Sequence, residues 1–368
     1  MIVYDPSGFL GDHHFTVQGQ AYSSVEDVYN KPGPRIAILD YLSSIEPDRS
    51  MFDLIIWYTL ENFYVIKSRV QDPRREVTMT PNSQGSDFCL SNWIHSTADI
   101  YKKSYFKPNL NCKYTATVLI GRISDRSSIK RNLNRAWIYY EFLERSWQNT
   151  VMATVRDQVS QESLLDQLSC CSTVGISLQK KIDLFGEIAP QHLPDYNKYE
   201  SADIRQALHS GQKTTDIFDQ GNLFDRRNLI PEHFYQNSFG DIVLQDYEQP
   251  GSFIDEKISK PLIMGRPFVV IASQHYLKNL RELGFQTFDP VIDESYDSEP
   301  DPVKRWTMVA DQINKLSKSN FQSVSDHLKK IIKHNRKLAC NSEYWSQRLK
   351  NWMNQKIQQI THRANVII

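Results

Sequence analysis

The chain has 368 residues, of which 40% are hydrophobic and 11% aromatic, so it is long enough to form two domains with cores of their own. Lys plus Arg and Asp plus Glu both number 43, so the overall charge does not favour nucleic acid or an acidic substrate. No apolar run reaches the roughly 18 residues of a membrane-spanning helix, and the N-terminus lacks the basic and apolar regions of a signal peptide. We therefore expect a soluble, cytoplasmic protein without a membrane span.

Short apolar runs rich in β-branched residues recur along the chain and alternate with stretches of helical periodicity. Several of these runs are continuous, which is typical of parallel strands that are covered on both faces. The expected strands are residues 1–4, 35–39, 53–58, 115–120, 173–178, 241–244 and 268–272. Strands that alternate with helices in this way indicate an α/β fold.

Helical periodicity is clearest at residues 127–145 and 274–283, and the second helix should end at Gly284. Beyond residue 302, apolar residues recur at three- and four-residue spacing to the end of the chain. This spacing predicts helices over 303–316, 322–337 and 342–360. The expected parts are an α/β domain over 1–111, a second α/β domain over 112–302, and C-terminal helices over 303–368.

The segment SGFLGDHHF, residues 7–15, follows the first expected strand. Its two glycines permit a close approach of the backbone to a ligand. Asp12, His13 and His14 form a dense acid/base cluster, and a His, or an Asp paired with one, suits a general base near neutral pH. The alternative is a surface loop without a catalytic role.

A second cluster of charge follows the expected strand at 115–120, in the sequence TATVLIGRISDRSSIKR. Its basic residues, gathered where a helix should begin, are Arg122, Arg126, Lys130 and Arg131. Cations are unfavourable at a helix N-terminus unless an anion relieves them, so this pattern favours an anion site. In the alternative, Asp125 caps the helix and the basic side chains point to solvent.

The segment FIDEKISKPLIMGRPFVVIAS, residues 253–273, places charged residues ahead of an apolar run. Glu256 can open a helix over about 256–264, with Pro261 inside it. Alternatively, the two oxygens of Glu256 bind vicinal hydroxyls of a sugar or ribose, while Lys257 or Lys260 faces a phosphate. The residues alone leave both interpretations open.

Other chemistry has little support in the sequence. The five cysteines show no spacing typical of a metal site, and no dinucleotide-binding, P-loop, nucleophile-elbow or zincin motif is present. We therefore expect no metal and no cofactor. From residue 303 onward the chain has 13 basic and 3 acidic residues. This excess of positive charge is typical of either a solvated helix face or a surface that binds a phosphate-rich partner.

Segment 253–273, with the following YLKNLRELGFQTFDPVIDESYD and Arg305, resembles a group of phage and bacterial glycosyltransferase-like proteins. These share Ser/Thr-Glu-Lys, then Lys-Pro, then Gly-x-Pro-Phe, and fucosyltransferase-type enzymes have a related Thr-Glu-Lys. Here Asp255 stands where the pattern has Ser or Thr. The resemblance covers about 60 residues and implies the GT-B architecture, in which two Rossmann-like domains face each other across a cleft.

The resemblance also implies roles for individual residues. Glu256 would bind the ribose or sugar hydroxyls of a nucleotide-sugar donor, and Lys257 would face its diphosphate. Arg122 matches the Arg that neutralises the leaving diphosphate in GT-B enzymes, with Lys130 or Arg126 as the accompanying cation. These enzymes need no divalent metal for this step.

The N-terminal domain would bind the acceptor, which is a glycan or another hydroxyl compound. If the reaction inverts the sugar's configuration, Asp12 or His13 would supply the base. One alternative is a phage-type enzyme that glycosylates hydroxymethylated bases in DNA, bound through the basic C-terminal region. Another is a non-catalytic module that binds a nucleotide-sugar or has a structural role.

Overall fold

The computed structural model describes residues 2–6, 20–40, 48–58, 70–80, 88–89, 94, 98, 110–120, 133–154, 232–245 and 254–366. The chain forms two compact units, which we call unit 1 and unit 2. Unit 1 comprises Met1–Asp99, Phe253–Asp255 and Lys337–Ile368, and unit 2 comprises Ile100–Ser252 and Glu256–Arg336. The fold is mixed α/β with a parallel sheet in each unit and a helical C-terminal section, as the alternation of strands and helices predicted.

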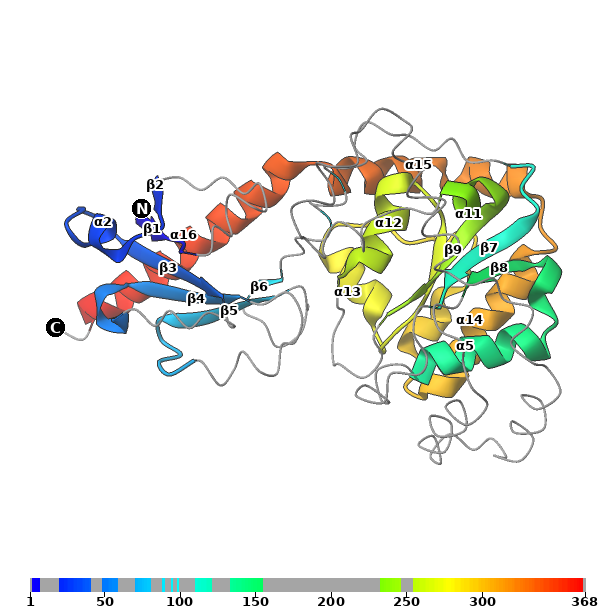
Figure 1. Ribbon diagram of the computed structural model, residues 1–368, viewed down its shortest axis with the longest axis horizontal. Helices are drawn as coiled ribbons and strands as arrows, with labels where there is room; N and C mark the ends of the chain where they lie inside the picture. Colours follow the sequence, from blue (N-terminus) through cyan, green and yellow to red (C-terminus); the bar gives the residue numbers. More distant parts are fainter. Residues whose placement is uncertain are drawn as a thin grey trace. The chain divides into compact units, whose positions relative to one another are not determined.

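The sheet of unit 1 has six described strands in the order β2-β1-β3-β4-β5-β6, and every neighbouring pair is parallel (Figure 1). They are β1 (Ile2–Tyr4), β2 (Gln20–Tyr22), β3 (Arg35–Asp40), β4 (Leu54–Tyr58), β5 (Glu76–Thr80) and β6 (Phe88–Cys89). The strand β1 lies between β2 and β3, so the connections on its two sides diverge. The carboxyl ends of β1 and β3 therefore form a topological switch point.

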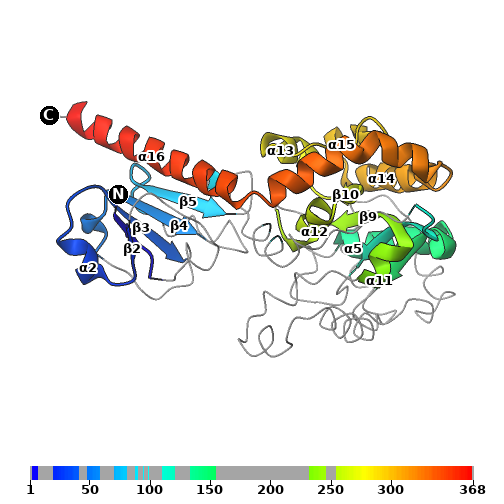
Figure 2. The same cartoon turned by 90° about the horizontal axis from the view of Figure 1, so that it is seen from above.

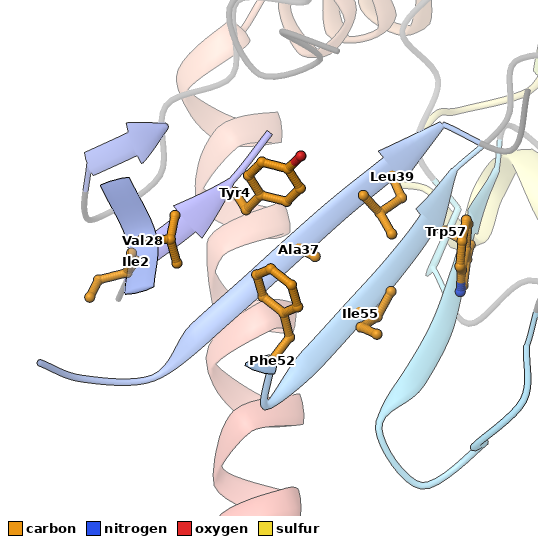
Figure 3. Close-up of a cluster of buried hydrophobic side chains, with 8 residues drawn as sticks. All are labelled: Ile2, Tyr4, Val28, Ala37, Leu39, Phe52, Ile55 and Trp57. Carbon is orange, nitrogen blue, oxygen red and sulfur yellow. The ribbon is translucent and has the colours of Figure 1, made fainter. Parts of the chain in front are cut away.

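Both faces of the unit 1 sheet are buried. Successive strand residues point to opposite faces, so Ala37 and Leu39 face one side while Ile36 and Ile38 face the other. The first side carries a cluster of buried side chains (Figure 3): Ile2, Tyr4, Val28, Ala37, Leu39, Phe52, Ile55 and Trp57. Helix α2 (Val25–Tyr29) contributes to this cluster, and α16 (Ser342–Val366) runs along the opposite side of the sheet (Figure 2).

The sheet of unit 2 repeats this topology among its described strands. Its order is β10-β9-β7-β8, again with every pair parallel. The strands are β7 (Tyr114–Leu119), β8 (Val151–Thr154), β9 (Ser238–Leu244) and β10 (Phe268–Ile271). Because β7 lies between β8 and β9, the switch point of this sheet lies at the carboxyl ends of β7 and β9.

Six α-helices of the described chain begin in unit 2. They are α5 (Leu133–Glu144), α11 (Glu232–Asn237), α12 (Glu256–Met264), α13 (Tyr276–Glu282), α14 (Pro302–Leu316) and α15 (Phe321–Ala339). Helices α5 and α14 lie side by side (Figure 1), and Arg145 Nη1 lies 2.7 Å from Asp311 Oδ1. The indole of Trp147, in the short 3-10 helix Trp147–Asn149, donates to Asn314 Oδ1 at 2.7 Å. These contacts join the residues that follow α5 to helix α14.

Several helix ends follow from local sequence signals. Asp301 caps α14 by accepting a hydrogen bond from the Lys304 amide at 2.8 Å, with Pro302 as the first helical residue. Gly265 and Gly284 follow the ends of α12 and α13 with φ of 70° and 96°, which is the left-handed conformation that glycine adopts without strain. The predicted end of a helix at Gly284 is therefore confirmed.

The six expected strands that fall on described residues are all present, and the seventh, residues 173–178, lies outside them. The expected helices over 274–283, 303–316, 322–337 and 342–360 are present as α13 to α16. The helix expected over 127–145 is described from residue 133 onward. Helices α14 and most of α15 belong to unit 2, whereas α16 belongs to unit 1. None of the described helices is long and apolar enough to cross a membrane.

The sequence did not predict β2, β5, β6 or β8. Strand β5 begins at Glu76, a charged residue that is buried in the sheet. Arg49 Nη1 lies 3.1 Å from its carboxylate, and the Trp57 indole and the Gln71 amide donate to it at 3.2 and 3.0 Å. Glu76 can be buried because these distant partners compensate its charge. Local periodicity does not reveal such a strand.

One cysteine of the described chain is deeply buried, in strand β6. Cys89 in β6 is buried, and its desolvation raises the pKa of the thiol to about 12, so it stays protonated at neutral pH. We expect a variant that keeps only this cysteine, with Cys112, Cys170, Cys171 and Cys340 changed to serine, to resist Ellman's reagent at pH 8. In urea the same thiol should react fully.

The matched control keeps only Cys340, which is partly exposed and should react in the native protein. Fast labelling of native Cys89, at the rate seen in urea, would contradict the burial of β6 beneath α16.

Candidate functional site

The carboxyl edge of the unit 2 sheet is the candidate site. Because all its described strands are parallel, their carboxyl ends meet at one edge, where open α/β sheets bind ligands. Strand β9 leads through residues 245–255 into α12, and α12 leads into the parallel neighbour β10. Helix α12 therefore runs against the strand direction, packed on β9, and its first residue lies at the carboxyl edge.

Glu256 and Lys257 open α12, which is one of the two interpretations that the sequence left open, and both are partly buried. The ammonium of Lys257 lies 3.6 Å from Glu256 Oε1, and their side chains are 25% and 17% exposed. A carboxylate is favourable at a helix N-terminus, whereas an ammonium is unfavourable there and gains from an anion. Helix α12 contains Pro261, which cannot donate the usual bond to the carbonyl four residues earlier.

Asn134 is a buried residue at the same edge that the sequence did not predict. Its Nδ2 donates to the backbone carbonyl of Gln245 and lies 3.5 Å from that of Ile271, so it joins the carboxyl ends of β9 and β10. Its Oδ1 is buried and accepts no hydrogen bond from the part of the chain that the structure describes. The sequence signal that could have identified Asn134 is its position, since it is a polar residue on the apolar face of the helix predicted over 127–145.

Arg266, in the Gly-Arg-Pro turn before β10, lies in a buried cluster at the amino-terminal ends of β9 and β10, opposite the candidate site. Its Nε lies 2.7 Å from Asp241 Oδ2, and its guanidinium donates to the carbonyls of Tyr235, Ser238 and Gly240 at 2.9 to 3.0 Å. The guanidinium carbon also lies 4.1 Å from the centre of the Tyr235 ring. The donors of Arg266 are engaged within the fold, so this residue is structural.

Lys260 belongs to the same region as this cluster. Burial raises the pKa of the Asp241 carboxyl, and the positive charges of Arg266 and Lys260 act against that rise. Lys260 is 7% exposed and lies one turn beyond Glu256 along α12, away from the helix N-terminus. That Lys260 faces a phosphate stays a prediction.

The turn between β10 and α13 is organised by Asp297. Its two carboxylate oxygens accept hydrogen bonds from the amides of Leu277 and Lys278 at 2.8 and 3.0 Å, and its carbonyl accepts one from the His275 amide at 2.7 Å. His275 has a φ of 66°, a left-handed conformation that is uncommon for residues other than glycine, although His adopts it more often than most. Asp297 thus supports a constrained turn at the carboxyl edge.

Two more charged residues, Glu294 and Arg305 in the part of the chain after α13, also have structural roles. Glu294 accepts a hydrogen bond from the Phe288 amide at 2.6 Å and lies 3.0 Å from Arg281 Nη1, while burial raises the pKa of its carboxyl. Arg305 is buried in α14 and donates to the carbonyls of Ala272 and Glu299. Both side chains hold together the loops that follow β10.

The other predicted site residues lie outside the described residues. These are the candidate base residues Asp12 and His13, which follow β1 in the sequence, and the candidate anion-binding residues Arg122, Arg126 and Lys130, which follow β7. Their roles stay predictions. In the described part of the chain, no three or more His, Cys, Asp or Glu side chains are grouped so as to hold a metal ion.

Compared with known proteins, the chain matches no family model, and no curated protein matches it significantly.

The buried ion pair gives a test of the unit 2 fold. Changing Arg266 to Met leaves the Asp241 carboxylate buried without its main partner, and such a loss costs about 3–5 kcal/mol. We expect a clear fall in the urea midpoint of unit 2, measured by tryptophan fluorescence. Arg266→Lys should recover only part of it, because an ammonium cannot reproduce the fork of donors.

The matched control is Lys329→Met, which removes an exposed partner of Asp326. Its midpoint should change little, because exposed ion pairs are weak. Equal effects of the two Met variants would argue against a structural role for Arg266.

Proposed function

We propose that the protein is a glycosyltransferase of the GT-B type, which transfers a sugar from a nucleotide-diphosphate-sugar to a hydroxyl acceptor. The observation that carries this proposal is that Glu256 and Lys257 begin α12 at the carboxyl edge of the unit 2 sheet. Ligands of open parallel sheets bind at this edge, beside the switch point. The shared strand order of the two units, with the first strand between the second and third, supports two Rossmann-like domains.

Donor binding is assigned by the chemistry of each group. Glu256 accepts hydrogen bonds from vicinal hydroxyls of the ribose or the sugar, because its carboxylate offers two oxygens. Lys257 faces the diphosphate, whose charge relieves the cost of an ammonium at a helix N-terminus. In the sequence, Arg122 follows the last residue of β7 by three positions, so the chain can reach the same edge.

The reaction needs stabilisation of the leaving group. As the glycosidic bond breaks, negative charge develops on the nucleotide diphosphate, and fixed cations stabilise that charge more in the transition state than in the ground state. Arg122 supplies one cation, with Lys130 or Arg126 as a second, and no metal ion takes part in this step. Asn134 Oδ1, a buried acceptor at the same edge, suits a ligand hydroxyl or N–H group.

The acceptor belongs to the N-terminal half of the chain in this proposal. Asp12 and His13 follow β1 in the sequence, and β1 is the strand beside the switch point of unit 1. If the reaction inverts, one of them removes the proton from the acceptor hydroxyl.

A DNA acceptor is the second candidate, and the exposed basic face of α15 favours it. Lys329, Lys330, Lys333 and Lys337 are all exposed on this helix. Binding of DNA through these cations would weaken steeply with added salt, whereas binding of a neutral glycan would not.

The direct test is a thermal-shift screen with UDP, GDP, CMP, dTDP and ADP, with and without EDTA. A nucleotide at 100 times its dissociation constant should stabilise the native state by about 2.7 kcal/mol. We expect one nucleotide to raise the melting temperature regardless of EDTA. The shift should be lost in Glu256→Gln and reduced in Lys257→Gln.

Matched controls separate ligand binding from helix capping. Glu343 lies in the first turn of α16, and Glu343→Gln should leave the nucleotide shift intact. Lys278→Gln removes an exposed cation of α13 and should do the same. No shift with any nucleotide, or an equal loss in Glu343→Gln, would contradict the proposal.

A further inference from the structure

An open pocket of about 490 Å³ lies on the surface of unit 1, between strand β6 and helix α16. Its volume falls within the roughly 300–1,000 Å³ of small-ligand pockets. It is lined by Phe88, Tyr344, Gln347, Arg348, Asn351, Trp352 and Gln355. These residues include none of the predicted site residues and have no part in the proposed nucleotide site of unit 2.

The helix side of the pocket consists of two parallel rows with a spacing of four residues. One row carries the amides of Gln347, Asn351 and Gln355, all exposed. Gln347 Nε2 donates to Asn351 Oδ1 at 2.7 Å, so these two amides are oriented by each other. An amide side chain offers both donors and acceptors, and a row of them suits a ligand that carries many hydroxyl groups.

The second row consists of Tyr344, Arg348 and Trp352, with an aromatic ring at each end, and it is held in place by packing. Tyr344 is 40% exposed, and Trp352 is partly buried. The Trp352 ring stacks on Phe88 with ring centres 4.6 Å apart and an interplanar angle of 24°. A fixed aromatic surface beside a row of amides can contact the apolar C–H face of a sugar ring while the amides bind its hydroxyls.

The charge of the pocket favours a neutral ligand. The described lining contains no carboxylate, and Arg348 is its cation. Arg348 Nη1 donates to the Cys89 carbonyl at 2.7 Å, and its guanidinium carbon lies 4.6 Å from the centre of the Phe88 ring and 5.8 Å from that of Trp345. The guanidinium is therefore engaged within unit 1, and a strand of nucleic acid would meet few cations for its phosphates.

We propose that this pocket on α16 binds a neutral oligosaccharide. The amide row forms hydrogen bonds with hydroxyl groups, and Trp352 with Tyr344 forms the apolar surface on which a sugar ring lies. This inference stands independently of the proposed nucleotide site, because it depends on residues of unit 1 alone.

The experiment applies the labelled full chain to an array of immobilised neutral oligosaccharides of glucose, mannose and N-acetylglucosamine. The dissociation constant for the best ligand is then measured by calorimetry for each variant. We expect Asn351→Ala and Gln355→Ala each to weaken binding about tenfold through lost hydrogen bonds. Trp352→Ala should abolish it, and binding should be insensitive to salt.

Exposed amides of the same helix that do not line the pocket provide matched controls. Asn354→Ala and Gln358→Ala should bind as the wild type does. The surface amide variants keep the test informative even if Trp352→Ala fails to fold.

The proposal would be overturned if the protein bound no neutral oligosaccharide at millimolar concentration. It would also be overturned if the Asn351 and Gln355 variants bound the oligosaccharide as tightly as the wild type does. Trp352-dependent, salt-sensitive binding of oligodeoxythymidylate instead would assign the pocket to single-stranded DNA. The absence of a shift with any nucleotide bears only on the proposed transferase, so failure of either proposal can be distinguished from failure of the other.

Discussion

Parallel pairing is the constraint on which the arrangement of this protein depends. In a parallel sheet each strand must be followed by a crossover, and all carboxyl ends lie along one edge. Both sheets satisfy this with the same described order, in which the first strand lies between the second and the third. The connections then diverge at that first strand, and this divergence leaves room for a ligand. In unit 2 the same constraint places the N-terminus of α12, with Glu256 and Lys257, at that edge.

The other end of the unit 2 sheet carries the buried charge. Arg266 joins the start of β9 to the turn before β10 through Asp241 and three backbone carbonyls. The two strands approach closely there, since a Cβ on Gly240 would lie 2.8 Å from the Pro267 carbonyl oxygen. A buried pair of this kind is costly to break, because either partner alone would be a buried, uncompensated charge. It fixes the strand starts, while Asn134 joins the strand ends.

The segment from Phe253 to Arg305 therefore contains residues of two kinds. Arg266, Glu294, Asp297 and Arg305 are engaged in caps, loops and the ion pair, so these residues stabilise the fold of unit 2. Glu256, with Lys257 beside it, differs, because both lie at the helix start and remain partly exposed. A motif of this length thus combines a structural requirement with a small part that can contact a ligand.

The sequence by itself determined the class of fold, because continuous apolar runs and helical periodicity depend on local burial, and these gave the long helices and most strands. It also determined the end of α13 at Gly284, since caps and turns depend on neighbouring residues. Only the tertiary structure decided that β5 is a strand, because Glu76 needs Arg49 from another part of the chain. It likewise decided that Arg266 is structural and that the amides and two aromatic side chains of α16 form a pocket with β6. These features arise from contacts between residues far apart in the chain, which no local pattern encodes.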